Sequence, residues 1–412
     1  MLSFMWADLR RMWAGALVVV LLVALATALG VTVTLQERAL RLGSARAADQ
    51  FDLVVGAAGS ETQLVLSSVF LQPAALPLMP GDVLTRLQKD PRVAWAAPVG
   101  FGDFFLDQPI VGTTPDLLTM GGQRQPREGR WFAGLQEAVV GSASPLTMGE
   151  RVVPMHGLSN QGGHEHAGAG YTVVGRLPPT GTAWDRAILV PIEAVWRIHG
   201  MGEGGHDHDH HAGDEEEHED HDEHGHAEAA APPGLPAIVV KPKTVADAYR
   251  LRGEYRASSS KGTVGVFPGE VLTQLYGTLG DARLVLSWVA LGAQVLVAAA
   301  VVLVTVVHVS QRRRQIGALR AFGAPRLAVF TLVWGELLAL VVLGLGLGYA
   351  LGFAAAWNLS RLFTGSFGVH LPVEFVAGDA AAAVGLLLVA ALVSAVPAVL
   401  AYRQSPASAL RG

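Results

Sequence analysis

Four long apolar segments most constrain how this chain can fold. The first runs from Trp13 to about Thr34 without a charged residue, and the other three cover 284–309, 327–357 and 379–402. Each is at least as long as the roughly 20 residues that a helix needs to cross a bilayer core. Because lipid offers no partners for open backbone groups, the sequence predicts four membrane-spanning α-helices.

A large mixed segment, residues 36–280, separates the first apolar segment from the other three. The chain as a whole is 51% hydrophobic and only 16% charged, which fits spanning helices combined with one extramembrane domain. Helical spacing at 81–90 and 244–256 alternates with β-branched runs, so the predicted fold of this domain is α+β. The runs end at Gly or Pro and predict strands at 51–56, 137–141, 171–175, 186–191 and 236–240.

The arginines predict the orientation of the spans. Arg10 and Arg11 precede the first span, and further arginines follow the second and fourth spans, whereas 363–378 has none. The positive-inside rule therefore places both termini in the cytoplasm and 36–280 outside. A cleavable signal peptide is the alternative for the first segment, but its apolar run continues past the Ala-rich sites, so we expect a membrane anchor.

The predicted layout follows from these spans. It comprises a cytoplasmic N-terminus at 1–12, spans at 13–35, 284–309, 327–357 and 379–402, an external domain at 36–280, a cytoplasmic segment at 311–325, an external loop at 358–378 and a cytoplasmic C-terminus at 403–412.

The cytoplasmic segment QRRRQIGALRAFGAP, residues 311–325, has more order than a connector needs. Its apolar residues recur every third position, which gives a short helix an apolar stripe, and Gly-Ala-Pro ends that helix. The arginines alone fit contact with anionic lipid, but a terminated amphipathic helix favours a protein partner. The predicted docking residues are Arg312, Arg313, Ile316, Gly317, Leu319, Arg320, Phe322 and Gly323.

The segments QRRRQIGALRAFGAPRLAVFTLVWGELLALVVLGLGLGYALG, at 311–352, and PAVLAYRQSPASALRG, at 397–412, resemble MacB/FtsX-type ABC transporter permeases. FDLVVGAAGS, GRWFAGLQEAVVGSASPLTMG and YTVVGRL resemble the external domain of that family. The resemblance implies a permease of the bacterial inner membrane with a periplasmic domain, which relays the motion of a separate ATPase outward. It also implies a permease homodimer, with a periplasmic adaptor or lipoprotein as a further partner.

The chain lacks the motif G-x-x-x-x-G-K-[ST], so it has no phosphate-binding loop of that type. ATP hydrolysis is therefore expected in another subunit. No nucleophile constellation is evident, and we expect neither enzymatic activity nor a tightly bound cofactor. The basic residues cluster beside spans, not on an aromatic-interleaved surface, which argues against nucleic-acid binding.

The third span carries two unusual features. Gly344, Gly348 and Gly352 form a small-residue face that allows close helix contact, either within the chain or with a second permease. Glu336 lies in the same span, where a charge is costly. We expect it to make a structural hydrogen bond or to be protonated, in preference to forming an ion pathway.

The insert 203–228 is the most distinctive polar stretch. It holds eight histidines and twelve carboxylates and should be disordered when unliganded. Without cysteines in the chain, imidazole and carboxylate ligands fit Zn²⁺, with Cu²⁺ or Ni²⁺ as alternatives; a solvated linker is the competing interpretation. The predicted metal ligands are His206, His208, His210, His211, His218, His221, His224 and His226, together with His164 and His166, which also fit a polar turn near His156.

Three functions are compatible with these features. The first is an ABC permease subunit linked to zinc or another divalent metal. The alternative is a membrane-anchored periplasmic metal sensor or adaptor without transport. A metal-ion channel is the weakest, because apart from Glu336 the spans carry no polar path.

Overall fold

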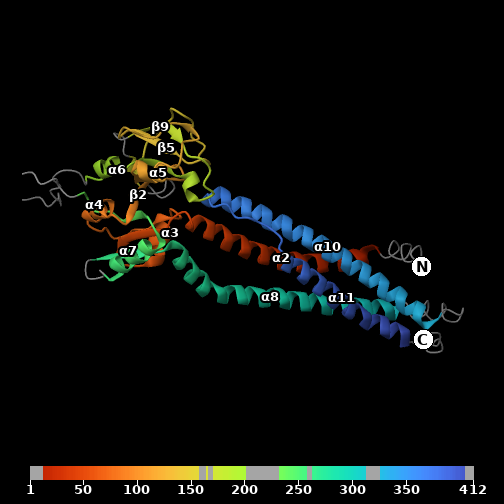
Figure 1. Ribbon diagram of the computed structural model, residues 1–412. Helices are drawn as coiled ribbons and strands as arrows, with labels where there is room; N and C mark the ends of the chain where they lie inside the picture. The colour runs from red at the N-terminus through yellow and green to blue at the C-terminus, as the bar shows by residue number, and fades with distance from the viewer. Residues whose placement is uncertain are drawn as a thin grey trace, which may run out of the picture. The chain divides into compact units, whose positions relative to one another are not determined.

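The computed structural model describes residues 13–156, 164–165, 170–200, 232–257, 262–311 and 325–403. The chain divides into two units, whose long helices and mixed sheet are seen in Figure 1. The helical unit comprises Met1–Leu42, Gly277–Leu362 and Leu371–Gly412. The sheet domain comprises Gly43–Tyr276 and Phe363–His370.

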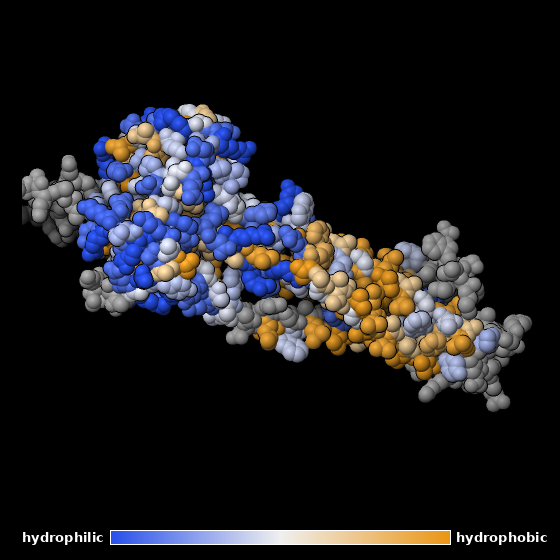
Figure 2. All heavy atoms as spheres, in the orientation of Figure 1, coloured by the Kyte–Doolittle hydropathy of each residue, from blue (hydrophilic) through white to orange (hydrophobic). Residues whose placement is uncertain are grey.

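Four long helices carry the apolar segments: α2 (Trp13–Ala48), α8 (Pro268–Gln311), α10 (Arg326–Phe367) and α11 (Ala377–Arg403). Among the described residues, three stretches are long and apolar enough to cross a membrane, namely Trp13–Ala48, Leu327–Phe367 and Ala377–Val399. The fourth predicted span, 284–309, lies within α8 and stays a prediction. Figure 2 shows apolar residues over much of the surface of the long helices and hydrophilic residues over most of the sheet domain.

Helix α10 is longer than the sequence predicts. The predicted third span ends at Trp357, but the helix continues to Phe367, so the predicted loop at 358–378 begins ten residues too early. Hydropathy falls after Trp357 while the helix persists, and the Arg361 guanidinium lies 4.6 Å from the centre of the Trp357 ring. The helix ends where Gly368, at φ +73°, donates its N–H to Thr364 O.

The sheet domain contains twelve strands in the described residues. All five strands that the sequence predicts are present, as β1, β5, β9, β10 and β11. The bounds are β1 Leu53–Ala57, β2 Val93–Phe105, β3 Gln108–Thr113, β4 Glu128–Gly129, β5 Glu137–Val140, β6 Arg151–Val152, β7 Met155–His156, β8 His164–Glu165, β9 Tyr171–Arg176, β10 Ile188–Pro191, β11 Ala237–Pro242 and β12 Thr263–Val266.

Strand β2 joins two parts of this mixed sheet. The strand order is β12-β1-β11-β2-β3-β10-β5-β9-β4, with β6 on β9, β7 on β2 and β8 on β7. The first half of β2 pairs with β11, and its second half pairs with β3 and β7. Pairs β3·β10 and β5·β9 are parallel, and the other pairs are antiparallel. The second half of β2 is therefore flanked by strands on both sides.

Short helices pack against the strands. The predicted helices at 81–90 and 244–256 are confirmed as α4 (Asp82–Lys89) and α7 (Val245–Ala257); α3 (Glu61–Ser68), α5 (Pro115–Thr119), α6 (Ile192–Ile198) and the 3₁₀ turn η2 (Ala183–Arg186) were not predicted. Apolar side chains of the strands and helices form one buried cluster, which removes their surface from water. Its members include Leu53, Val55, Val83, Leu87, Ile188, Val190, Val240 and Leu251.

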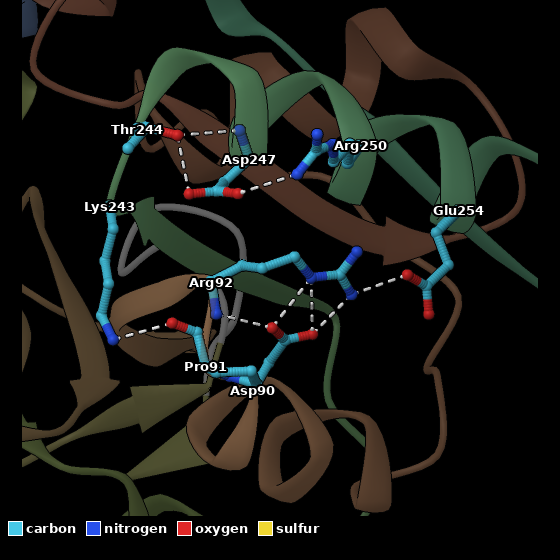
Figure 3. A network of polar contacts seen from close by, with 8 residues as sticks. All are labelled: Asp90, Pro91, Arg92, Lys243, Thr244, Asp247, Arg250 and Glu254. Carbon is cyan, nitrogen blue, oxygen red and sulfur yellow. Dashed lines mark hydrogen bonds and ion pairs between the residues drawn. The ribbon is translucent and has the colours of Figure 1, made fainter.

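A polar network ties the start of β2 to α7 (Figure 3). Arg92 donates from Nη2 to Asp90 Oδ2 at 2.6 Å and to Glu254 Oε2 at 2.8 Å. Lys243 Nζ donates to Pro91 O at 2.7 Å. The hydrogen bonds from Arg92 lower the pKa of Asp90. The turn between α4 and β2 is thereby held by charged hydrogen bonds that strengthen its contact with α7.

Candidate functional site

A cavity of about 490 Å³ lies in the sheet domain. Its walls come from residues 71–78, the second half of β2, the neighbouring strand β3, helix α6 and the segment 234–236. Most lining residues are apolar, and Asp103 and His199 are the two lining residues with ionisable side chains. An apolar cavity with a few polar groups that converge is the usual form of a binding site.

Asp103 and His199 meet in this cavity. Asp103, on β2, is 4% exposed, and its Oδ1 lies 3.7 Å from Nε2 of His199 at the end of α6. The other ring nitrogen of His199, Nδ1, lies 2.9 Å from Val195 O. Because a carbonyl oxygen can only accept, His199 Nδ1 donates this hydrogen bond, and Nε2 is the nitrogen that faces Asp103. Sequence reasoning assigned no role to His199, whereas the fold places it beside Asp103.

Two further histidines occupy register positions in line with Asp103. Asp103 on β2 is the antiparallel partner of His156 on β7, and His156 is the partner of His164 on β8. Positions 103, 156 and 164 therefore form one row across three strands.

Tyr171 is a buried phenol in the same part of the sheet. It is 2% exposed, and its hydroxyl has no hydrogen-bond partner among the residues that the structure describes. Burial raises the pKa of this phenol, and the charge of Asp103 raises it further. Tyr171 therefore remains a neutral hydroxyl that can donate a hydrogen bond.

The other predicted metal ligands lie outside the described residues. These are the histidines of the insert, from His206 to His226, and His166. Of the predicted set only His164 is placed, by its backbone, on β8. Among the described residues, no three His, Cys, Asp or Glu side chains are close enough to hold a metal ion.

The predicted docking residues also lie outside the described part of the chain. Residues 312–324, which include Ile316, Leu319 and Phe322, fall between the end of α8 at Gln311 and the start of α10 at Arg326. The interpretation of this segment as a coupling helix therefore stays a prediction.

The glycine face of α10 packs against α2 of the same chain. A Cβ on Gly344 would lie 2.7 Å from Val23 Cβ, one on Gly348 would lie 2.5 Å from Thr27 Cβ, and one on Gly352 would lie 2.7 Å from Val31 Cβ. These separations leave no room for a side chain. Close packing within the chain accounts for the glycines without a second permease.

Glu336 is partly buried within α10. Sequence reasoning missed a more prominent charged contact in the helical unit: Arg38 on α2 and Asp379 near the start of α11 form a two-pronged ion pair, with Nη1–Oδ2 at 2.7 Å and Nη2–Oδ1 at 2.8 Å. Both side chains are about one-seventh exposed, at 15% and 14%. Opposite charges flanking two apolar segments were the available signal, but nothing in the sequence pairs them.

One protein-family model matches part of the helical unit. Residues 288–407 match the FtsX-like permease C-terminal family. No curated protein matches the chain. The periplasmic region of MacB from Actinobacillus actinomycetemcomitans is similar at 10% identity and a TM-score of 0.33, over 56% of this chain and 95% of that one.

A second solved structure gives a similar result. The extracellular domain of the noncanonic ABC-type transporter YknZ from Gram-positive bacteria matches at 11% identity and a TM-score of 0.29, over 52% of this chain and 98% of that one. The family match covers α10, α11 to its end and most of the apolar part of α8. Residues 288–407 are therefore similar to the C-terminal domain of FtsX-like permeases, which supports the resemblance to MacB/FtsX-type ABC transporter permeases.

Proposed function

We propose that this chain is the permease subunit of an inner-membrane ABC transporter that relays the motion of a separate ATPase to its periplasmic sheet domain. The family match over residues 288–407 is the observation that carries this proposal. In this proposal both termini and residues 311–325 are cytoplasmic, and the four spans of each subunit assemble with those of a second copy. The work performed is mechanical and serves the export or extraction of a substrate.

The lengths of the helices support mechanical relay. Helix α8 has 44 residues and α10 has 42. At 1.5 Å per residue the two helices measure roughly 63–66 Å, about twice the thickness of a hydrocarbon core. Helices of this length continue beyond the bilayer without a break, so a displacement at one end can be carried to the other.

Contacts inside the helical unit support movement of its helices as a group. The glycines of α10 hold it against α2, and the Arg38–Asp379 pair joins α2 to α11. A charged pair with two parallel hydrogen bonds fixes both distance and orientation. Three of the four long helices are therefore joined by contacts that resist separation.

The insert adds metal binding to the proposed function. Its eight histidines and twelve carboxylates between Glu203 and Glu228 fit weak binding of several Zn²⁺ ions. We connect this insert to the permease as a device that concentrates metal near the periplasmic domain. The metal can then act as cargo or as a regulator of that domain.

Docking of the ATPase is tested by reconstitution. The chain is co-expressed with the ATPase encoded beside it, and the complex and its ATPase rate are measured in nanodiscs. Replacing Ile316, Leu319 and Phe322 together by Asp removes the apolar stripe and should abolish the complex. Val245→Asp is the matched control, because Val245 is 76% exposed on α7 of the sheet domain. An unaltered complex in the triple variant contradicts the proposed docking face.

The same experiment separates transport from the alternative function. A metal sensor or adaptor without transport needs no ATPase. If the wild-type chain forms no complex with an ATPase and yet binds zinc through its periplasmic domain, the sensor is the function that remains.

A further inference from the structure

We propose that the cavity of the sheet domain is a binding site for an aromatic small molecule that carries a hydrogen-bond donor. The cavity measures about 490 Å³, which lies within the range of about 300–1,000 Å³ typical of small-molecule sites. All of its lining residues belong to the sheet domain. The site goes beyond the permease proposal and does not depend on ATPase docking.

Helix α6 and strand β3 form an apolar wall of the cavity. Four residues at helical spacing along α6 line it: Ile192, Val195, Trp196 and His199. Pro109 and Val111, two positions apart on β3, line it as well. An added Cβ on Gly112 would lie 2.6 Å from Val195 Cγ2, so glycine allows α6 to lie this close to the strand. This packing fixes the helix face that borders the cavity.

Two aromatic rings in the wall indicate the class of ligand. Phe104 of β2 and Trp196 of α6 line the cavity together with aliphatic side chains. Both rings are only partly buried, so they can offer surface to a ligand. Aromatic rings attract one another in offset or edge-to-face contacts beyond the gain from buried apolar area. Water finds few partners against apolar walls, and an aromatic molecule that displaces it gains binding energy.

Asp103 and His199 form a polar region in this cavity. The His199 side chain is 23% exposed and that of Asp103 is 3% exposed, so the imidazole is the more accessible of the two. A carboxylate has about four acceptor positions, so contact with one partner leaves it able to accept another hydrogen bond. A ligand N–H or O–H is therefore the polar group that fits this region.

Residues 72–78, here called the strap, supply another wall and have neither helix nor strand structure. Among the described residues, no backbone hydrogen bond involves 73–78; the nearest are Gln72 N to Leu66 O and the pairing of Met79 with Leu235. Leu71, which precedes the strap, has φ +53°, a strained conformation of the kind found at ligand sites. A wall held only at its ends can adjust to a ligand without breaking backbone hydrogen bonds.

The test uses the full chain in nanodiscs with one introduced cysteine, because the chain has none of its own. Ala74→Cys places a thiol on the strap in the cavity wall, and Val245→Cys is the control, at an exposed position of α7 that does not line the cavity. Alkylation by N-ethylmaleimide is followed by mass spectrometry while N-phenyl-1-naphthylamine, an aromatic amine with one N–H, is titrated. At a free concentration ten times its Kd, this probe should slow alkylation of the Ala74→Cys chain about tenfold and leave the Val245→Cys chain unchanged.

A matched pair of leucines locates the bound probe. Leu78→Asp, added to the Ala74→Cys chain, places a charge in the cavity wall and should raise the Kd of the probe severalfold. Leu106→Asp is the control, because Leu106 is 59% exposed and Leu78 is 55% exposed, but only Leu78 lines the cavity. This control should leave the Kd unchanged.

Two further probes test the class of ligand. In 1-phenoxynaphthalene an ether oxygen replaces the N–H, so it should bind about 2–10-fold more weakly than the amine. Dodecanol, a linear aliphatic alcohol, should protect the thiol less than the amine does at equal free concentration.

The proposal is overturned if N-phenyl-1-naphthylamine leaves alkylation of the Ala74→Cys chain unchanged, or if Leu78→Asp and Leu106→Asp have equal effects. Equal binding of the amine and the ether contradicts the required donor, and stronger protection by dodecanol contradicts an aromatic ligand. Because the assay contains no ATPase, failure here leaves the permease proposal intact.

Discussion

His199 Nε2 lies 3.7 Å from Asp103 Oδ1, at the wall of a cavity formed by β2, β3 and α6. The carboxylate is buried, and Nδ1 of the imidazole donates a hydrogen bond to Val195 O. Two polar groups are thereby fixed in an apolar setting. This relationship joins β2 to the end of α6 at the wall of the cavity.

The glycines of α10 offer a matched pair of substitutions. Gly348→Ala places a Cβ 2.5 Å from Thr27 Cβ and 2.8 Å from Ala24 O, so α10 must move away from α2. We expect a loss of about 1–3 kcal/mol, seen as a lower melting temperature in detergent. Gly346→Ala meets nothing within 4 Å and should be neutral or slightly stabilising. Equal effects of the two substitutions would disprove this packing.

The Arg38–Asp379 pair should matter more than a surface ion pair. Asp379→Asn leaves the Arg38 guanidinium, 15% exposed, without its two-pronged partner, and we expect a loss of about 2–3 kcal/mol. Arg41→Gln is the control, because Arg41 is 56% exposed and its pair with Glu37 is worth less than about 0.5 kcal/mol. The melting temperatures of both variants are compared with that of the wild-type chain, and Asp379→Asn should show the larger decrease. Exchanging both charges, in Arg38→Asp with Asp379→Arg, should recover part of the loss.

The lowered pKa of Glu137 predicts that the stability of the sheet domain depends on pH. Hydrogen bonds from Arg130, and then from the N–H of Ala133 and Gly134, lower its pKa to about 2. Because the folded pKa lies below the ordinary value near 4.5, its contribution is complete above pH 4.5 and is lost as pH falls toward 2. Glu137→Gln should therefore lower Tm at pH 7, and the difference from wild type should shrink below pH 4.5. A difference that is constant with pH contradicts this role.

Much of the architecture could be predicted from local patterns. The apolar runs, the β-branched strands such as Leu53–Ala57 and the helices α4 and α7 are local features of the sequence, and the structure confirms them. The end of α10 could not be placed, because hydropathy falls at Trp357 whereas the backbone stays helical until Gly368.

The candidate site was only partly predictable. His164 stood out because it lies in a His-Glu-His run, but Asp103 and His199 are single residues in unremarkable contexts. The packing of the end of α6 beside β2 brings Asp103 and His199 together, and such a long-range contact is set by tertiary packing. The same holds for Arg38 and Asp379, which come from opposite ends of the chain.

The central claim is that ATP hydrolysis by a partner moves the sheet domain. The chain contains no cysteine, so Val245→Cys, at an exposed position of α7, accepts one spin label per subunit. The distance between the two labels of a homodimer is measured by pulsed electron resonance in nanodiscs with the ATPase bound. Addition of ATP should shift this distance, and the triple Asp variant of Ile316, Leu319 and Phe322 should abolish the shift. A distance distribution that ATP leaves unchanged in the wild-type complex would contradict the claim.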